Sequence, residues 1–171
     1  MLTHENLMAM ALGYLAEVDP VAATDCLLHA APMSHGSGLY LVPHLLAGAK
    51  QVIPESGKFD PEEIASILPY HEGISFFAAP TMVKRLIAAP SIQSRDLHHL
   101  KTIVYGGGPM YVSDLKAALK VLGNRLVQIY GQGETPMTIS VLSKAHHSLV
   151  DHPQWEQRLG SVGVPQAIVE V

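Results

Sequence analysis

Two glycine-rich segments of the sequence carry side chains that could hold a nucleotide and a metal ion. In "YGQGETP" (130–136), the Tyr130 ring offers a face for stacking, and Gly131 and Gly133 leave the backbone open to a ligand. Glu134 adds the hard carboxylate oxygen that suits Mg²⁺. The alternative interpretation of this segment is a plain surface turn with a solvated carboxylate.

The second segment, "YGGGPM" (105–110), places three glycines before Pro109. Residues without a Cβ can adopt positive φ or let a flat ligand approach the backbone. A tight turn explains the same glycines equally well. The chain has neither a G-x-G-x-x-G fingerprint here nor a G-x-x-x-x-G-K-[ST] phosphate loop anywhere. A nucleotide site would therefore depend on base and metal contacts, with the phosphate grip missing or supplied elsewhere.

The histidines divide into one candidate and two pairs. His35 lies between small residues directly after an apolar run, which leaves its ring accessible for a gating or carboxylate-contacting role. A satisfied structural histidine is the alternative. The pairs at 98–99 and 146–147 lack the spacing of metal ligands, since neighbours in sequence point apart, and we expect them on the surface or in loops. The absence of a G-x-S-x-G elbow argues against a hydrolase.

Five short apolar runs predict the strands that position these segments. They cover 26–32, 50–54, 74–80, 101–107 and 125–131. Helical patterns occupy 3–18, with Thr3 as N-cap, and 36–47, 60–70 (with Asp60 as N-cap), 80–89 and 111–122. Runs this apolar are typical of strands covered on both faces, and their alternation with helices indicates βαβ units. We predict an α/β fold with an open, mostly parallel sheet and helices on both faces.

The chemistry-bearing segments all follow strands, so they should meet at the carboxyl edge of the sheet, where ligands bind in such folds. This clustering disfavours a plain flavodoxin-like domain without these ligands. Beyond it we expect a further strand from Thr138, a loop over 144–166, and the interior of a strand over 167–171, "AIVEV".

Length and composition limit the class of protein. The 171 residues, 48% hydrophobic and 15% charged, fit one globular domain with a real core. The net charge of −4 argues against a nucleic-acid partner. The apolar windows are too short for a membrane span, and no signal peptide is evident. The single cysteine, Cys26, should be a small buried residue at a strand start and suits a reducing, cytoplasmic location.

Five motifs, taken in order, resemble those of the adenylate-forming superfamily, which includes acyl-CoA synthetases, the adenylation domains of peptide synthetases and luciferases. They are "LTHENL", "APMSHGSGL", "YGGGPM", "QIYGQGET" and "RLGSVGVP". The resemblance covers essentially the whole chain. It implies that 1–171 is a middle section of the AMP-binding N-terminal domain, with the phosphate loop before it and the mobile C-terminal domain after it.

The resemblance also implies a role for each matching position. Eight positions would line the nucleotide site: Gly107, Gly108, Pro109, Gln128, Tyr130, Gly131, Gln132 and Gly133. The first three would lie against the adenine, and Tyr130 would pack on the same base. Glu134 would bind the Mg²⁺ that bridges the ATP phosphates, and His35 would sit at the carboxylate end of an acyl pocket lined by small residues. Glu134 and His35 are thus the expected catalytic residues.

The implied activity is that of an acyl-CoA synthetase: ATP activates a fatty or aromatic carboxylic acid to acyl-AMP, and CoA then takes the acyl group. Gly133 departs from the family, which usually has a threonine there on the α-phosphate; the Gly133 N–H is a substitute. Much of the charge-stabilising machinery would lie outside these residues. We therefore expect the parent protein to be an enzyme and the 171 residues alone to be inactive. A non-catalytic nucleotide-binding or interaction module is the alternative.

Overall fold

The computed structural model describes residues 1–171 and confirms the α/β fold. One sheet contains β1 (Cys26–Leu28), β2 (Lys50–Val52), β3 (Ile74–Ala78), β4 (Leu100–Tyr105), β5 (Leu126–Tyr130), β6 (Ser140–Leu142) and β7 (Val164–Pro165). The helices are α1 (His4–Gly13), α2 (Gly36–Leu39), α3 (Leu41–Leu46), α4 (Pro61–Ile67), α5 (Pro80–Ala88), α6 (Pro90–Gln93), α7 (Val112–Leu122), α8 (Lys144–Ser148) and α9 (Trp155–Leu159). A π-helical turn, η1 (Tyr14–Val18), extends α1, and a 3₁₀ turn, η2 (Leu68–Tyr70), extends α4. None of these helices is long and apolar enough to cross a membrane.

The strands follow the order β2-β1-β3-β4-β5-β6-β7 across the sheet. The first five are parallel, whereas β6 runs antiparallel to β5, and β7 antiparallel to β6. The order reverses at β1, because the chain adds β2 on one side of it and β3 on the other. In open α/β sheets such a reversal leaves a crevice beyond the carboxyl ends of the two strands.

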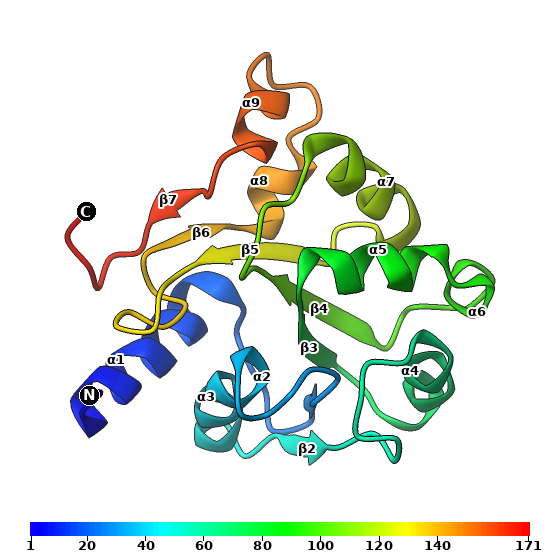
Figure 1. Ribbon diagram of the computed structural model, residues 1–171, viewed down its shortest axis with the longest axis horizontal. Coiled ribbons are helices and arrows are strands. Elements are labelled where there is room, and N and C mark those ends of the chain that lie inside the picture. The colour runs from blue at the N-terminus through cyan, green and yellow to red at the C-terminus, as the bar shows by residue number, and fades with distance from the viewer.

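Helices cover both faces of the sheet, as predicted (Figure 1). On one face α1, η1 and the α2–α3 segment enclose a small core that includes Met10, Tyr14 and Tyr40. On the other face α4, α5, α7 and α9 pack on a larger core with Leu86 and Leu115. Cys26 is buried at the start of β1, as expected.

Capping residues fix where several helices begin. The Asn6 N–H donates to Thr3 Oγ1 at 3.1 Å, and the Glu62 N–H donates to the Asp60 side chain at 3.0 Å. Pro80 occupies the first turn of α5, where its missing N–H has no helical partner to lose. These contacts confirm the predicted helix starts and leave only Ala79 between β3 and α5.

The prediction of a loop over 144–166 is wrong, because the segment contains α8, α9 and β7. The helices α8 and α9 have five residues each and β7 has two, so none of them is long enough to show an apolar periodicity. The Ser143 hydroxyl caps α8 by accepting a hydrogen bond from the His146 N–H at 3.4 Å, and the Trp155 indole of α9 donates to the His147 carbonyl at 2.9 Å. The strand expected over 167–171 is also wrong: strand pairing ends at β7, and the Val169 N–H donates back to Gln166 at 3.2 Å in a turn.

Buried charges hold together the amino edge of the sheet, remote from the glycine segments. Asp19 accepts hydrogen bonds from the Thr102 hydroxyl at 2.6 Å and from Lys144 Nζ at 2.9 Å. Lys101 Nζ lies 2.6 Å from Asp25 and 3.6 Å from Asp19. This charge cluster joins the end of η1 to the start of β4 and to α8.

Candidate functional site

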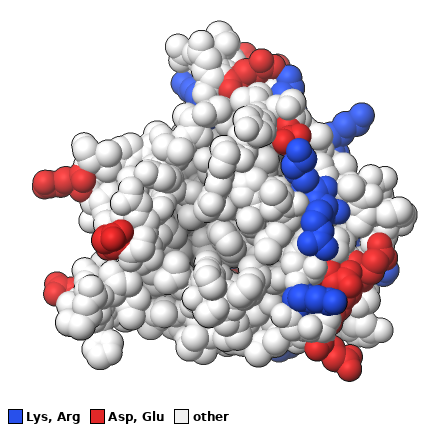
Figure 2. Space-filling model, in the orientation of Figure 1, with Lys and Arg blue, Asp and Glu red and all other residues white.

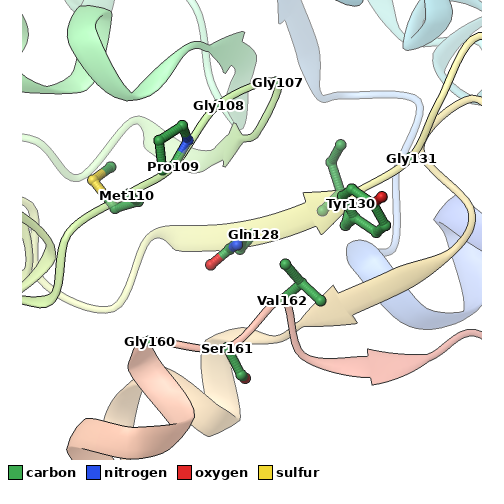
Figure 3. A pocket seen from close by; sticks show the side chains of 11 residues that line it. Gly107, Gly108, Pro109, Met110, Gln128, Tyr130, Gly131, Gly160, Ser161 and Val162 are labelled. Carbon is green, nitrogen blue, oxygen red and sulfur yellow. The ribbon is translucent and has the colours of Figure 1, made fainter.

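A cavity of about 500 Å³ opens where β4 and β5 end, facing the segment that follows α9 (Figure 3). Residues 107–110, 128–131 and 160–162 line it, and we call it the Gln128 cavity. It brings together six of the eight positions predicted for a nucleotide: Gly107, Gly108, Pro109, Gln128, Tyr130 and Gly131. Its volume falls within the range of small-molecule sites.

A second cavity of about 490 Å³ lies beside it, at the crevice where the strand order reverses. We call it the His35 cavity; its wall includes His35 after β1, Phe77 of β3, and residues 131–133 after β5. The two remaining predicted positions, Gln132 and Gly133, are therefore found here. The cavities share Gly107, Ile129 and Gly131, so they meet along one edge.

The shape of the shared edge depends on two glycines. Gly107 has a φ of +76°, which side chains rarely allow. At Gly131 an added Cβ would lie 2.4 Å from the backbone nitrogen of Met137, so the loop cannot accept one without moving. Gly108 and Gly133 differ from these two. A Cβ at Gly108 would come no closer than 3.8 Å to its nearest neighbour, Pro80, and a Cβ at Gly133 would meet no atom within 4 Å. The fold does not require these two glycines.

Behind Gln128 lies a buried chain of hydrogen bonds. Tyr105 and Gln128 are direct partners in the β4–β5 ladder, so their side chains share one face. The Tyr105 hydroxyl oxygen lies 3.1 Å from Gln128 Oε1 and 2.9 Å from His147 Nε2. His147 Nδ1 in turn lies 2.7 Å from the Ser143 carbonyl oxygen.

His147 was expected on the surface or in a loop, and that expectation is wrong. The residue is 1% exposed, on α8, with its ring edge-on to Tyr105. Burial lowers the pKa of His147 from its usual 6.5 to about 4, although the bond to Ser143 opposes the shift. Burial also raises the pKa of Tyr105, so both groups are neutral at pH 7. The sequence pattern missed His147 because α8 has no apolar periodicity.

Both cavities are lined without Lys, Arg, Asp or Glu. Figure 2 shows that the charged side chains of this face gather toward its rim, while its hollowed centre is almost entirely uncharged. Such walls suit a flat base and an apolar ligand better than a triphosphate, whose charge needs cationic or N–H partners.

His35 and Glu134 do not line a common cavity. The exposed His35 ring is at the mouth of the His35 cavity, with Nδ1 2.9 Å from the Ser34 hydroxyl. Glu134 is exposed on the loop after β5 and borders a separate hollow of about 110 Å³, between that loop and Ala9 of α1. No group of three potential metal-ligating side chains is present.

The residues around His35, Gly106 and Gly131 were expected to be small, but the wall of the His35 cavity also contains large apolar side chains. Phe77 and Tyr40 form a stacked pair in the wall of the His35 cavity, with ring centroids 5.7 Å apart, and Leu39 and Met137 also line it. Phe77 lies in a predicted strand, "ISFFAAP", where adjacent residues face opposite sides. Its place near the strand's carboxyl end was the one available indication.

Residues 160–162 were not predicted as part of the site, although the motif "RLGSVGVP" contains them. They lie across the Gln128 cavity from Gly108, and Figure 3 shows the Gln128 side chain between them and Pro109. Because the surrounding segment was expected to be a loop, its position beside β5 could not be foreseen. The antiparallel β6 and β7 bring it there.

Comparisons with known proteins agree on one family. The sequence profile described as AMP-binding enzyme matches residues 1–171. The chain is 33% identical to a feruloyl-CoA synthase of Amycolatopsis sp, covering all of this chain and 33% of that protein. It is 30% identical to the medium/long-chain-fatty-acid–CoA ligase FadD8 of Mycobacterium tuberculosis, covering 99% of this chain and 28% of the relative.

Among solved structures, the O-succinylbenzoate coenzyme A synthetase MenE of Bacillus subtilis, in complex with AMP, superposes with a TM-score of 0.79. The two sequences are 25% identical, and the match covers 96% of this chain and 31% of that one. The chain thus spans about a third of the length of the proteins it matches.

Proposed function

The chain belongs to the AMP-binding enzyme family, and we propose that the protein containing it is an AMP-forming ligase that activates a carboxylic acid with ATP. In the first step a carboxylate oxygen attacks the α-phosphorus of ATP, and pyrophosphate leaves as acyl-AMP forms. In the second step the thiolate sulfur of CoA attacks the acyl carbon, and AMP leaves. The observation that carries the proposal is the Gln128 cavity, in which six predicted nucleotide positions meet.

The Gln128 cavity would take the adenine. The backbone of Gly107 and Gly108 offers a flat wall without side chains, and the Tyr130 ring, 39% exposed, remains available for stacking. Gln128 supplies the buried polar group that a base needs for orientation. The uncharged lining fits a neutral base.

The His35 cavity would take the acid. Phe77 and Leu39 give its body an apolar surface, and the carboxylate would point to the edge that the two cavities share. His35, exposed at the mouth, would donate a hydrogen bond to that carboxylate. A fatty or aromatic acid suits this lining, in keeping with the acids named in the two ligase relatives.

Glu134 would hold Mg²⁺. One exposed carboxylate without other protein ligands fits the usual coordination of Mg²⁺ at nucleotides, in which phosphate oxygens and water complete the shell. The bound ion would neutralise part of the phosphate charge. In this chain the Gly133 N–H would donate to the α-phosphate in place of a hydroxyl.

We further propose that the 171 residues do not catalyse alone, because neither cavity carries a cation for the phosphates. The protein would act in the cytoplasm, where ATP and CoA are available. The alternative, a non-catalytic module, would bind ATP without supporting any chemistry.

Acid-dependent exchange of labelled pyrophosphate into ATP tests the proposal in the complete protein, across a panel of fatty and aromatic acids. We expect exchange with at least one acid, and its loss in Glu134→Ala. The matched control is Glu72→Ala, an exposed glutamate before β3 at the opposite edge of the sheet. ATP binding without exchange for any acid would favour the non-catalytic module, and full exchange by Glu134→Ala would reject the metal role.

A further inference from the structure

We propose that Tyr105 and His147 are positioning residues that set the hydrogen-bonding direction of Gln128 and thereby select adenine over a 6-oxopurine. Both are buried, at 0% and 1% exposure, and neither lines the Gln128 cavity. They act through the amide of Gln128, which does line it. The assignment rests on the proposed function, because it requires a purine in that cavity.

The direction follows from counting protons along the chain of bonds. The Ser143 carbonyl can only accept, so His147 Nδ1, 2.7 Å away, carries the ring proton. In a neutral imidazole the other nitrogen is then an acceptor, and Nε2 receives the Tyr105 O–H at 2.9 Å. The single hydroxyl proton of Tyr105 is thereby used.

Gln128 must adapt to this arrangement. Gln128 Oε1 is placed 3.1 Å from the Tyr105 oxygen, where it would compete with His147 for the one hydroxyl proton. Because that proton is directed to His147, the Tyr105 oxygen can only accept, and we assign the amide the reverse orientation, with its NH₂ end donating to Tyr105. Asn and Gln amides take the orientation that their hydrogen-bond partners demand. The Gln128 carbonyl oxygen is then the end that faces the cavity.

A carbonyl oxygen of Gln128 that faces the cavity would distinguish purines by the group they carry at position 6. Adenine carries an amino donor there, whereas hypoxanthine and guanine carry an oxo acceptor. A carbonyl facing the cavity bonds the amino group and opposes the oxo group. If His147 lost its acceptor, Tyr105 would donate to Gln128 instead, and the NH₂ end would turn to the cavity.

This arrangement of hydrogen bonds requires a neutral His147 ring, and the groups around the ring favour the neutral form. No carboxylate contacts the ring; its hydrogen bonds are to Tyr105 and Ser143, and the other titratable groups on α8 are Lys144 and His146. The indole of Trp155 on α9 donates to the His147 carbonyl and so holds α8 in place.

The test is equilibrium binding at pH 7.5 of ATP, ITP and purine riboside triphosphate, which lacks a substituent at position 6, to the complete protein. We expect wild type to prefer ATP over ITP. His147→Leu should reverse the direction of that preference, and Tyr105→Phe should reduce it about tenfold, the effect of roughly one hydrogen bond. His147→Gln, whose side-chain carbonyl can accept from Tyr105, should keep the wild-type preference.

Two controls separate positioning from a general loss of structure. Purine riboside triphosphate should bind equally to wild type and to all three variants, because it makes no contact at position 6. Tyr14→Phe removes a buried hydroxyl that has no hydrogen-bond partner and should change nothing. Should His147→Leu not fold, the nearly isosteric Tyr105→Phe supplies the test.

The outcomes are distinct. Wild type that binds none of the three nucleotides would overturn the proposed function, and the assignment with it. Wild type that prefers ATP, with variants that keep the full preference, would overturn the assignment alone. Variants that weaken all three nucleotides equally would show a structural role and overturn it as well.

Discussion

Acidification should destabilise the protein through His147. Its pKa lies at about 4 in the folded state against 6.5 when exposed, so the unfolded chain binds a proton that the folded one excludes. The stability due to this neutral ring is complete above about pH 6.5 and is lost as pH falls toward 4. Between pH 7 and pH 5 the loss should be about 2 kcal/mol, from the two pKa values and 1.36 kcal/mol per unit.

Urea unfolding at pH 7, 6 and 5 measures this loss. The single tryptophan, Trp155, is a suitable probe because its indole donates to the His147 carbonyl. His147→Gln should reduce the loss of unfolding free energy between pH 7 and pH 5 by about 2 kcal/mol. Some slope should remain, because burial also lowers the pKa of His44. The control His4→Gln, at the exposed first position of α1, should keep the wild-type slope.

The reasoning would be refuted if His147→Gln and wild type lost the same free energy of unfolding between pH 7 and pH 5. An NMR titration gives a second reading of the same quantity. A His147 ring that takes up its proton near pH 6.5 in the folded protein would contradict the buried, neutral state directly.

Three further predictions concern other parts of the molecule. Gly131→Ala should lower the free energy of unfolding in urea by about 1–3 kcal/mol, because its Cβ would lie 2.4 Å from the Met137 nitrogen. Gly133→Ala should leave that free energy unchanged, because its Cβ would meet nothing within 4 Å. Equal effects of the two substitutions would contradict the loop geometry. Lys144→Met should lower the free energy of unfolding in urea by about 2 kcal/mol, because it removes a partner of the buried Asp19 carboxylate. The loss should be smaller than for a carboxylate left with no partner, because Lys101 Nζ stays 3.6 Å away. An unchanged urea midpoint would show that the charge cluster does not contribute to stability. Gly108→Val should leave the urea midpoint unchanged but weaken ATP binding to the complete protein at least tenfold by calorimetry, as a branched side chain would enter the Gln128 cavity; tight binding would mean that this loop is only a turn.

The sequence was most informative where patterns are local. The five apolar runs became β1 to β5, and Thr3 and Asp60 begin α1 and α4, because caps and strand hydrophobicity depend on neighbouring residues. The gathering of glycine segments at one edge also followed, since parallel strands share their carboxyl ends. The predicted roles of Glu134 and His35 remain predictions.

What failed depended on contacts between distant residues. His147 is buried by Tyr105, which is 42 residues earlier in the chain, and no local pattern at 144–148 encodes that contact. The 160–162 segment reaches the Gln128 cavity only through two antiparallel pairings at the end of the sheet. Phe77 was recognised as a strand residue, but its exposure to the His35 cavity depends on Gly36, whose missing Cβ makes room for the ring.

The narrow edge common to the two cavities has a consequence for how such a protein diversifies. Only Gly107, Ile129 and Gly131 belong to both walls, and the two glycines contribute no side chain. Substitutions at Phe77 or Leu39 can therefore reshape one compartment while the other keeps every wall residue it has. Under the proposed function, such substitutions would change the accepted acid and leave the nucleotide contacts intact. A directed library confined to the His35 side should therefore retain most of its ATP-binding members.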